Sequence, residues 1–286
     1  MRWGMSSSRL FSYGSHLLCC LIILLSYLPI ASEYYAHFPP SGFDFYQMAA
    51  YESYIREDFG FWTGLWKYTW FCGVPLSRDY ALLHMYLALP FAHFFGDVGG
   101  CKIYLLFTSY LFAVFSYLLF FELSKSKTLA LLLANIMVWS PNVYLVLFGG
   151  CLTFAATQMV LPLSLFLLIK YYHTDDKRFL FLSSGISGLS ILGHQPAGGL
   201  LVFLPSLIVI LLWAKTRFLK RLGNFFCYIA VTMLVCMPSF ALYNYNFMAL
   251  SRVLLRIAGE SPALYASLHG SQAWNFFSTT NVFLYL

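Results

Sequence analysis

The sequence predicts an all-α, polytopic helical membrane protein, and three features of its 286 residues indicate this fold class. The chain is 60% hydrophobic and only 10% charged, whereas soluble domains carry about 25% charged residues. Its apolar residues come in long blocks, and a helix needs roughly 20 apolar residues to cross about 30 Å of hydrocarbon. Alternating apolar and polar residues do not recur as they would in a membrane β-barrel.

Seven blocks are long enough, or nearly so, to cross the bilayer. They are His16–Ala31, Cys101–Phe121, Leu129–Phe148, Leu152–Ile169, Phe179–Leu192, Gly198–Trp213 and Phe225–Tyr243. An eighth block, Ala81–Phe95, is shorter and contains Pro90. If this block also crossed, every later segment would change sides, so its placement decides the topology.

The distribution of Lys and Arg decides against an eighth crossing. If the block does not cross, eleven of the 17 Lys and Arg residues fall in short segments on the same side of the membrane as the N-terminus. Short basic segments remain in the cytoplasm, so we expect a cytoplasmic N-terminus, about 7 spans and Ala81–Phe95 at the outer leaflet. The basic residues lie in short clusters between apolar blocks, a pattern of membrane topology that argues against a nucleic-acid partner.

The chain is therefore expected to form a single transmembrane domain with two external segments, residues 32–100 and about 244–275. Alternatively, the first block could be a cleaved signal peptide with Arg2 and Arg9 before it. The last residues, Asn281–Leu286, resemble the start of a further helix, which suggests a C-terminally truncated fragment of a longer chain. Among the cysteines, a Cys72–Cys101 disulfide would fit this topology, and no Cys/His spacing indicates a metal site.

The external segment carries two stretches with helical spacing. Asp44 precedes a helix-permissive run and could cap it, with Tyr51 on the same face. Further on, Trp62, Trp66 and Trp70 are spaced four apart. Such spacing is typical of a helix lying at the headgroup level, so we expect membrane-parallel helices here.

Short motifs in this segment and in the later spans resemble those of a known family. The residues that carry the resemblance are Gly42-Phe43-Asp44, Trp70, Gly73-Val74-Pro75-Leu76, Pro90, Ser140-Pro141-Asn142, Leu161-Pro162-Leu163 and Leu192-Gly193-His194. Together they are similar to the C-type (GT-C) glycosyltransferase superfold, and most to the membrane proteins called 6-pyruvoyl-tetrahydropterin-synthase-related. The resemblance implies the plasma (inner) membrane of a prokaryote and a long external loop with an acidic residue after the first span.

The resemblance also implies a chemistry, the transfer of a sugar from a polyprenyl-phosphate donor at the extracytoplasmic face. Asp44 would be the catalytic base, since a partly desolvated carboxylate has a raised pKa. Cations would neutralise the lipid phosphate. Candidate substrate-binding residues are Arg78, Lys102, His194 and Tyr51.

The family pattern is incomplete at one point, and this keeps other functions open. The turn Gly149–Thr153 lacks the second carboxylate that many of these enzymes carry. A divalent metal is therefore doubtful, and we assign no cofactor. The alternatives are a transporter or lipid-handling scaffold, in which Pro141, Pro162 and Pro205 would break spans, or a degenerate, non-catalytic relative of the enzymes. The sequence does not indicate an oligomeric state.

Overall fold

A computed structural model describes most of the helical part of the chain, residues 7–36, 45, 49, 53, 66–67, 74–75, 83–150, 152–194, 197–213 and 218–237. Side chains at 7–13, 66–67, 74–75, 85 and 153 are outside this description. By its internal contacts the chain divides into two units, Met1–Ser239 and Phe240–Leu286. All described residues belong to the first unit.

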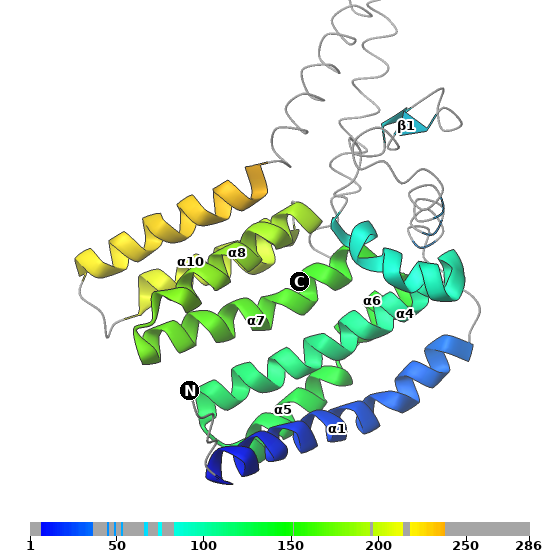
Figure 1. Ribbon diagram of the computed structural model, residues 1–286, viewed down its shortest axis with the longest axis horizontal. Coiled ribbons are helices and arrows are strands. Elements are labelled where there is room, and N and C mark those ends of the chain that lie inside the picture. The colour runs from blue at the N-terminus through cyan, green and yellow to red at the C-terminus, as the bar shows by residue number, and fades with distance from the viewer. Residues whose placement is uncertain are drawn as a thin grey trace, which may run out of the picture. The chain divides into compact units, whose positions relative to one another are not determined.

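The described part is helical, with one two-residue strand pair (Figure 1). Its elements are α1 (Ser7–Ala36), β1 (Trp66–Lys67), β2 (Val74–Pro75), α4 (Leu83–Ser124), α5 (Lys127–Val138), α6 (Pro141–Gly149), α7 (Leu152–Thr174), α8 (Lys177–Gly193), the π-helix η1 (Gly198–Phe203), α10 (Leu204–Leu212) and a last helix, Phe218–Met237. Four described helices are long and apolar enough to cross a membrane, or five if α5 and α6 form one bent span. The predicted class, a helical membrane protein, is confirmed.

Helices α1 and α4 lie side by side and run in opposite directions. The Tyr27 hydroxyl on α1 donates to the Leu106 carbonyl at 3.1 Å, and the Tyr110 hydroxyl on α4 donates to the Cys20 carbonyl at 3.2 Å. These pairs make α1 and α4 antiparallel. We name the bundle end that holds the tight turns Lys125–Ser126 and Asp175–Asp176 the Lys125 end. The opposite end, where α8 finishes, is the His194 end.

The two turns at the Lys125 end have the same backbone conformation and the same kind of helix cap. Lys125 and Asp175 adopt left-handed backbone conformations, with φ of 56° and 58°. The next residue then caps the following helix, because the Ser126 hydroxyl accepts from Leu129 N and the Asp176 carboxylate accepts from Arg178 N. Short polar side chains at the N-cap satisfy the free amides of a first helical turn. The turns bring the basic clusters of the sequence to one end.

Two of the expected spans are not continuous α-helices. The predicted span Leu129–Phe148 is broken after Val138, and α5 and α6 meet at an angle of 41°. Pro141 stands in the first turn of α6, where a missing amide is tolerated but the preceding helix cannot continue. The predicted span Gly198–Trp213 begins as the π-helix η1 and continues as α10.

The segment Leu83–Phe95 folds back on the rest of α4 at Gly96, which has φ 72°. A Cβ added at Gly100 would lie 2.3 Å from the Ala92 Cα, so the two backbones touch. A Cβ added at Gly193, at the end of α8, would lie 3.9 Å from Leu83 Cδ2. Both ends of this segment therefore lie at the His194 end.

Between α1 and α4 the structure describes the chain at a few positions only. Phe45, Ala49 and Ser53 have helical backbone at intervals of four, as predicted. Trp66, however, belongs to strand β1, which pairs antiparallel with β2 in the register Trp66↔Pro75. The predicted Trp-rich helix is therefore wrong at this point. The four-residue spacing of the tryptophans is overridden because Val74–Pro75 offers an extended partner whose proline favours extended backbone.

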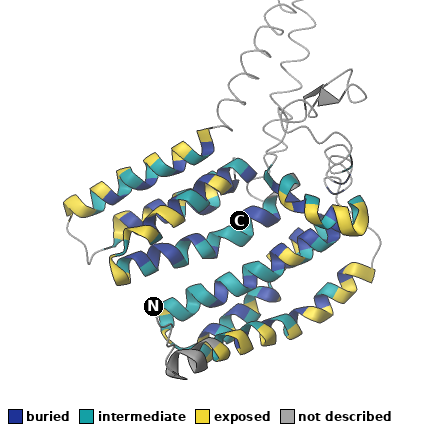
Figure 2. Ribbon diagram, viewed as in Figure 1, coloured by how far each residue is buried: buried dark blue, intermediate teal, exposed yellow. Residues whose placement is uncertain are grey.

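The buried side chains form two clusters that α7 joins. One cluster lies among α1, α4, α5, α6 and the start of α7, and the other among the end of α7, α8, α10 and the last helix. Figure 2 shows the buried residues on the sides where helices face one another and the exposed ones on the outer sides. The exposed residues are mostly large and hydrophobic, as expected where the solvent is lipid.

Candidate functional site

Five residues are candidates from the sequence, and the structure describes two of them. Asp44, Tyr51 and Arg78 lie outside the described residues. Lys102 and His194 are described, and both lie at the His194 end of the bundle, since α4 leaves that end and α8 reaches it.

Lys102 is a buried cation, only 5% exposed. Its Nζ donates to the Tyr35 carbonyl at 3.3 Å and lies 5.8 Å and 5.7 Å from the ring centroids of Tyr34 and Tyr35. Aromatic faces attract an ammonium group through their negative potential. An ammonium held in such a low-dielectric place interacts strongly with an anion that reaches it.

The position of Lys102 follows from the fold-back at Gly96. Lys102 lies in the turns of α4 that the segment Leu83–Phe95 covers, since Phe91 packs on Tyr104 with ring centroids 6.3 Å apart. That segment also brings His84, which is fully buried, to the same end. His93 is exposed. No group of three His, Cys, Asp or Glu side chains with metal-binding geometry occurs within the described residues.

His194 ends one helix and begins the next. Its amide donates to the Ser190 carbonyl at 2.9 Å, and its carbonyl accepts from Gly198 N at 2.7 Å. Its Nδ1 accepts from Ala197 N at 3.2 Å. An acceptor Nδ1 requires the neutral ring to carry its hydrogen on Nε2. The turn therefore fixes the orientation of the imidazole.

A cluster of buried hydroxyls lies where four helices meet, and sequence reasoning did not find it. We call it the hydroxyl cluster; its members are Ser164 on α7, Ser183 and Ser187 on α8, Ser206 on α10 and Tyr228 on the last helix, all fully buried. Ser164 Oγ is 2.9 Å from Ser183 Oγ, and Ser187 Oγ is 2.6 Å from the Tyr228 hydroxyl. The i,i+4 spacing of Ser183 and Ser187 was the one available signal.

The hydroxyl cluster is neutral and internally satisfied. Ser206 donates to the Val202 carbonyl at 2.8 Å, and Ser183 donates to the Ser164 carbonyl at 2.9 Å. Ser164 Oγ also lies 3.2 Å from Ser206 Oγ and 3.3 Å from the Tyr228 hydroxyl. Hydroxyls can donate and accept at once, so the cluster links all four helices without burying a charge.

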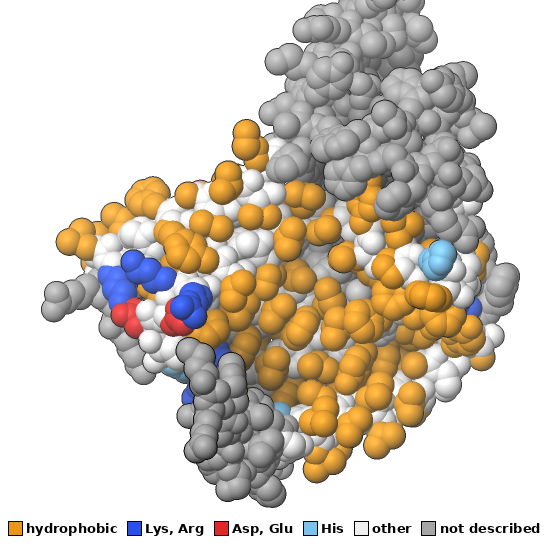
Figure 3. Space-filling view, in the orientation of Figure 1, with side chains coloured by type: hydrophobic (Ala, Val, Ile, Leu, Met, Phe, Trp, Pro, Cys, Tyr) orange, Lys and Arg blue, Asp and Glu red, His pale blue; other side chains and the backbone are white. Residues whose placement is uncertain are grey.

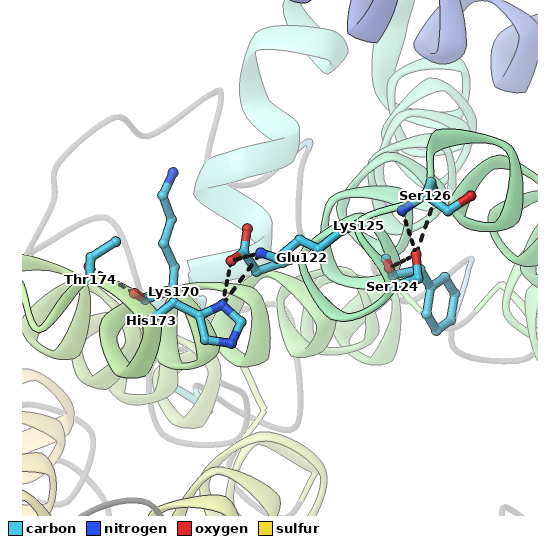
Figure 4. Close-up of polar contacts among 8 residues, drawn as sticks. Glu122, Ser124, Lys125, Ser126, Lys170, His173 and Thr174 are labelled. Carbon is cyan, nitrogen blue, oxygen red and sulfur yellow. Dashed lines mark hydrogen bonds and ion pairs between the residues drawn. The ribbon is translucent and has the colours of Figure 1, made fainter.

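The Lys125 end holds a different polar group, shown in Figure 4. Glu122 on α4 accepts from Lys125, and its Oε1 lies 2.6 Å from His173 Nδ1 on α7. Nearby, Lys220 Nζ pairs with Asp175 Oδ1 at 2.6 Å. These contacts join helices that are distant in the sequence and lie at the end opposite to Lys102.

No model of a known protein family matches the chain, and no curated protein sequence matches it.

Proposed function

We propose that the chain is a membrane glycosyltransferase-like protein that transfers a sugar from a polyprenyl-phosphate donor to an acceptor hydroxyl. In this proposal it crosses the bilayer about seven times, its N-terminus is cytoplasmic, and the reaction takes place at the extracytoplasmic face. The observation that carries the proposal is the buried ammonium of Lys102 at the His194 end. A leaving group that carries a phosphate needs a cation where negative charge develops.

The reaction assigns one role to each candidate. Asp44 accepts the proton of the acceptor hydroxyl, whose oxygen forms a bond to the anomeric carbon. The bond from that carbon to the phosphate oxygen breaks, and its electron pair stays with the phosphate. Lys102 and Arg78 neutralise that phosphate, while Tyr51 and His194 hold the sugar. Attack opposite the leaving group inverts the anomeric centre. No metal is assigned a role.

One further contact supports this arrangement. Asp44 precedes Phe45 in the chain, and Phe45 is fully buried. A Cβ added at Gly150, at the end of α6, would lie 2.6 Å from the Phe45 Cβ. The helical stretch that follows Asp44 is therefore anchored at the His194 end, the end that also carries Lys102.

The test is transfer from a fluorescent polyprenyl-phosphate sugar by the purified chain in proteoliposomes. Removing a general base costs roughly 100-fold or more, so we expect Asp44→Asn to lose activity by that factor and Lys102→Gln to lose it by about 10-fold. Lys127→Gln, at the opposite end, is the matched control and should keep full activity. Undiminished transfer by Asp44→Asn would remove the proposed base.

A second candidate, a transporter or lipid-handling scaffold, is favoured by one observation. The hydroxyl cluster lies in the middle of its four helices, and helix breaks occur in the α5–α6 pair and at η1. Broken helices and polar groups at mid-depth are common in transporters. Flux of a lipid-linked sugar that depends on Ser164, with no transfer from any donor, would favour this function. A degenerate relative of the enzymes would show neither flux nor transfer.

A further inference from the structure

Three cations lie beside the tight turn that joins α7 to α8 at the Lys125 end. Lys170 stands near the end of α7, and Lys177 and Arg178 are the first two residues of α8. Lys177 and Arg178 are exposed, while Lys170 is half-buried with an ammonium that reaches the surface. Among the described residues, no ion pair or hydrogen bond engages the charged groups of these three side chains. Their charges are therefore open to a ligand.

The carboxylates described at this end do not neutralise the three cations. Asp175 pairs with Lys220 at 2.6 Å, and Glu122 is engaged in the contacts of Figure 4. The Asp176 carboxylate accepts from Arg178 N at 3.0 Å, so it caps the helix and does not pair with a charged side chain. The surface beside this turn thus carries an excess of positive charge, which attracts anions.

Two phenyl rings hold the ammonium of Lys170 close to α8. Its Nζ lies 5.3 Å from the centroid of Phe166 on α7 and 4.9 Å from the centroid of Phe179 in the first turn of α8. Aromatic faces attract a cation, but the three hydrogens of the ammonium remain available to oxygen acceptors. Because Phe179 directly follows Arg178, this contact brings the charge of Lys170 to the beginning of α8.

The apolar outer side of α8 adjoins these cations. Phe181 and Leu182 are 46% and 54% exposed. They follow Lys177 and Arg178 by four residues, so each of these cations shares a helix face with an exposed apolar side chain. Figure 3 shows Lys and Arg side chains gathered near the ends of α7, α8 and the last helix, next to a largely hydrophobic surface. Anionic lipid headgroups lie at such a boundary, and long basic side chains extend toward them.

We propose that Lys170, Lys177 and Arg178 bind the phosphate group of an anionic phospholipid, with an acyl chain of this lipid lying on Phe181 and Leu182. A phospholipid matches both surfaces, whereas a soluble anion matches only the charged one. A bound headgroup would link α7 to α8, because the cations belong to both helices. The site lies at the end of the bundle opposite to the candidate functional site and does not depend on the proposed transferase.

The test is the thermal unfolding midpoint of the full chain in detergent, with phosphatidylglycerol or phosphatidylcholine added in equal amounts. A ligand that binds only the folded state raises the midpoint, and we expect phosphatidylglycerol to raise it by about 2–4 °C more than phosphatidylcholine. Arg178→Gln should lose at least half of that difference. Lys127→Gln is the matched control, because it removes one cation at the same end but from α5, and it should retain the difference.

Two further variants separate the charge of the site from the folding of the chain. Arg178→Lys keeps a cation and should keep most of the phosphatidylglycerol effect, whereas Arg178→Glu places a negative charge there and should abolish it. Inorganic phosphate is the remaining arm, and if it gave the whole effect, the site would be one for a soluble anion and the proposal would be wrong. Equal losses in Arg178→Gln and Lys127→Gln, or no preference for phosphatidylglycerol, would also overturn it.

Discussion

Gly150 shows how one residue can position a predicted loop. It caps the end of α6 in a left-handed conformation, with φ 67°, and it packs against Phe45. A side chain at this position would be strained by the backbone and would also collide with the Phe45 Cβ. The sequence marks Gly149-Gly150 as a turn, but only the structure shows that the absent side chain makes room for Phe45.

We expect Gly150→Ala to lower the free energy of unfolding by about 1–3 kcal/mol, because it combines backbone strain with a steric clash. Gly185→Ala is the matched control. Gly185 lies inside α8 with nothing within 4 Å of an added Cβ, so alanine should be neutral or stabilising there by up to about 1 kcal/mol. Denaturant unfolding in mild detergent measures both. A neutral Gly150→Ala would contradict the packing of Phe45 on this turn.

Glu122 is the residue that ties α4 to α7 at the Lys125 end. Its side chain is 13% exposed, while those of its partners His173 and Lys125 are 34% and 58% exposed. Water and salt screen such an ion pair, so its contribution is small.

We expect Glu122→Gln to reduce the free energy of unfolding by at most about 1 kcal/mol, and less at high salt. Asp175→Asn, which removes a partner of Lys220 that is 70% exposed, should have a smaller effect. Unfolding at low and at high ionic strength measures both. Equal losses in the two variants, unchanged by salt, would show that the Glu122 pair is not the stronger contact.

At the scale of the helices, hydrogen bonds between buried hydroxyls add to the packing of the hydrophobic clusters. Lipid tails are as apolar as the side chains that face them, so membrane helices associate through close packing and hydrogen bonds. Close packing occurs beside the hydroxyl cluster as well. A Cβ added at Gly188 would lie 2.6 Å from the Val235 Cβ, and one at Gly198 would lie 2.5 Å from Ser190 and Ile191 backbone atoms.

We expect Ser164→Ala to lower stability by about 0.5–2 kcal/mol, since its hydroxyl reaches three other helices. Ser116→Ala is the matched control, because Ser116 is also buried but donates only to the Phe112 carbonyl of its own helix. Its loss should stay below about 0.5 kcal/mol. A double-mutant cycle of Ser164 and Ser206 would reveal their coupling, and an absence of coupling would contradict a shared network.

At the scale of the whole unit, the alternating directions of the helices determine at which end the charged side chains lie. Lys125, Lys127, Lys177 and Lys220 reach one end because each tight turn reverses the chain. Figure 3 shows how strongly the charges are gathered at one end of the view. The positive-inside rule is the one argument for the orientation of this end, and by that rule we expect it to face the cytoplasm.

Single cysteines test the orientation and the fold-back together. In a background without native cysteines, we expect Asp79→Cys and His194→Cys to react with a membrane-impermeant maleimide added outside intact cells. Ser126→Cys should react only after permeabilisation, because it lies at the Lys125 end. If Asp79→Cys shared the behaviour of Ser126→Cys, the segment Leu83–Phe95 would cross, and Asp44 would lose its place at the extracytoplasmic face.

Local sequence patterns were enough to predict the class of the protein, most of its helices and the clustering of its basic turns. These properties depend on the length of each apolar block and the charge of each short connection. The sequence also pointed to Gly96 as the end of an apolar block, because glycine readily takes the conformation that the fold-back needs.

Which side chains meet became visible only in the folded bundle. Ser164 and Tyr228 are 64 residues apart, and nothing in either local sequence indicates that their hydroxyls lie 3.3 Å apart. The burial of Lys102 beside Tyr34 and Tyr35 likewise depends on how α4 packs against α1. The apolar pattern of a span is enough to predict that it enters lipid. Which helices it contacts depends on packing and hydrogen bonds between helices, and these cannot be read from one segment alone.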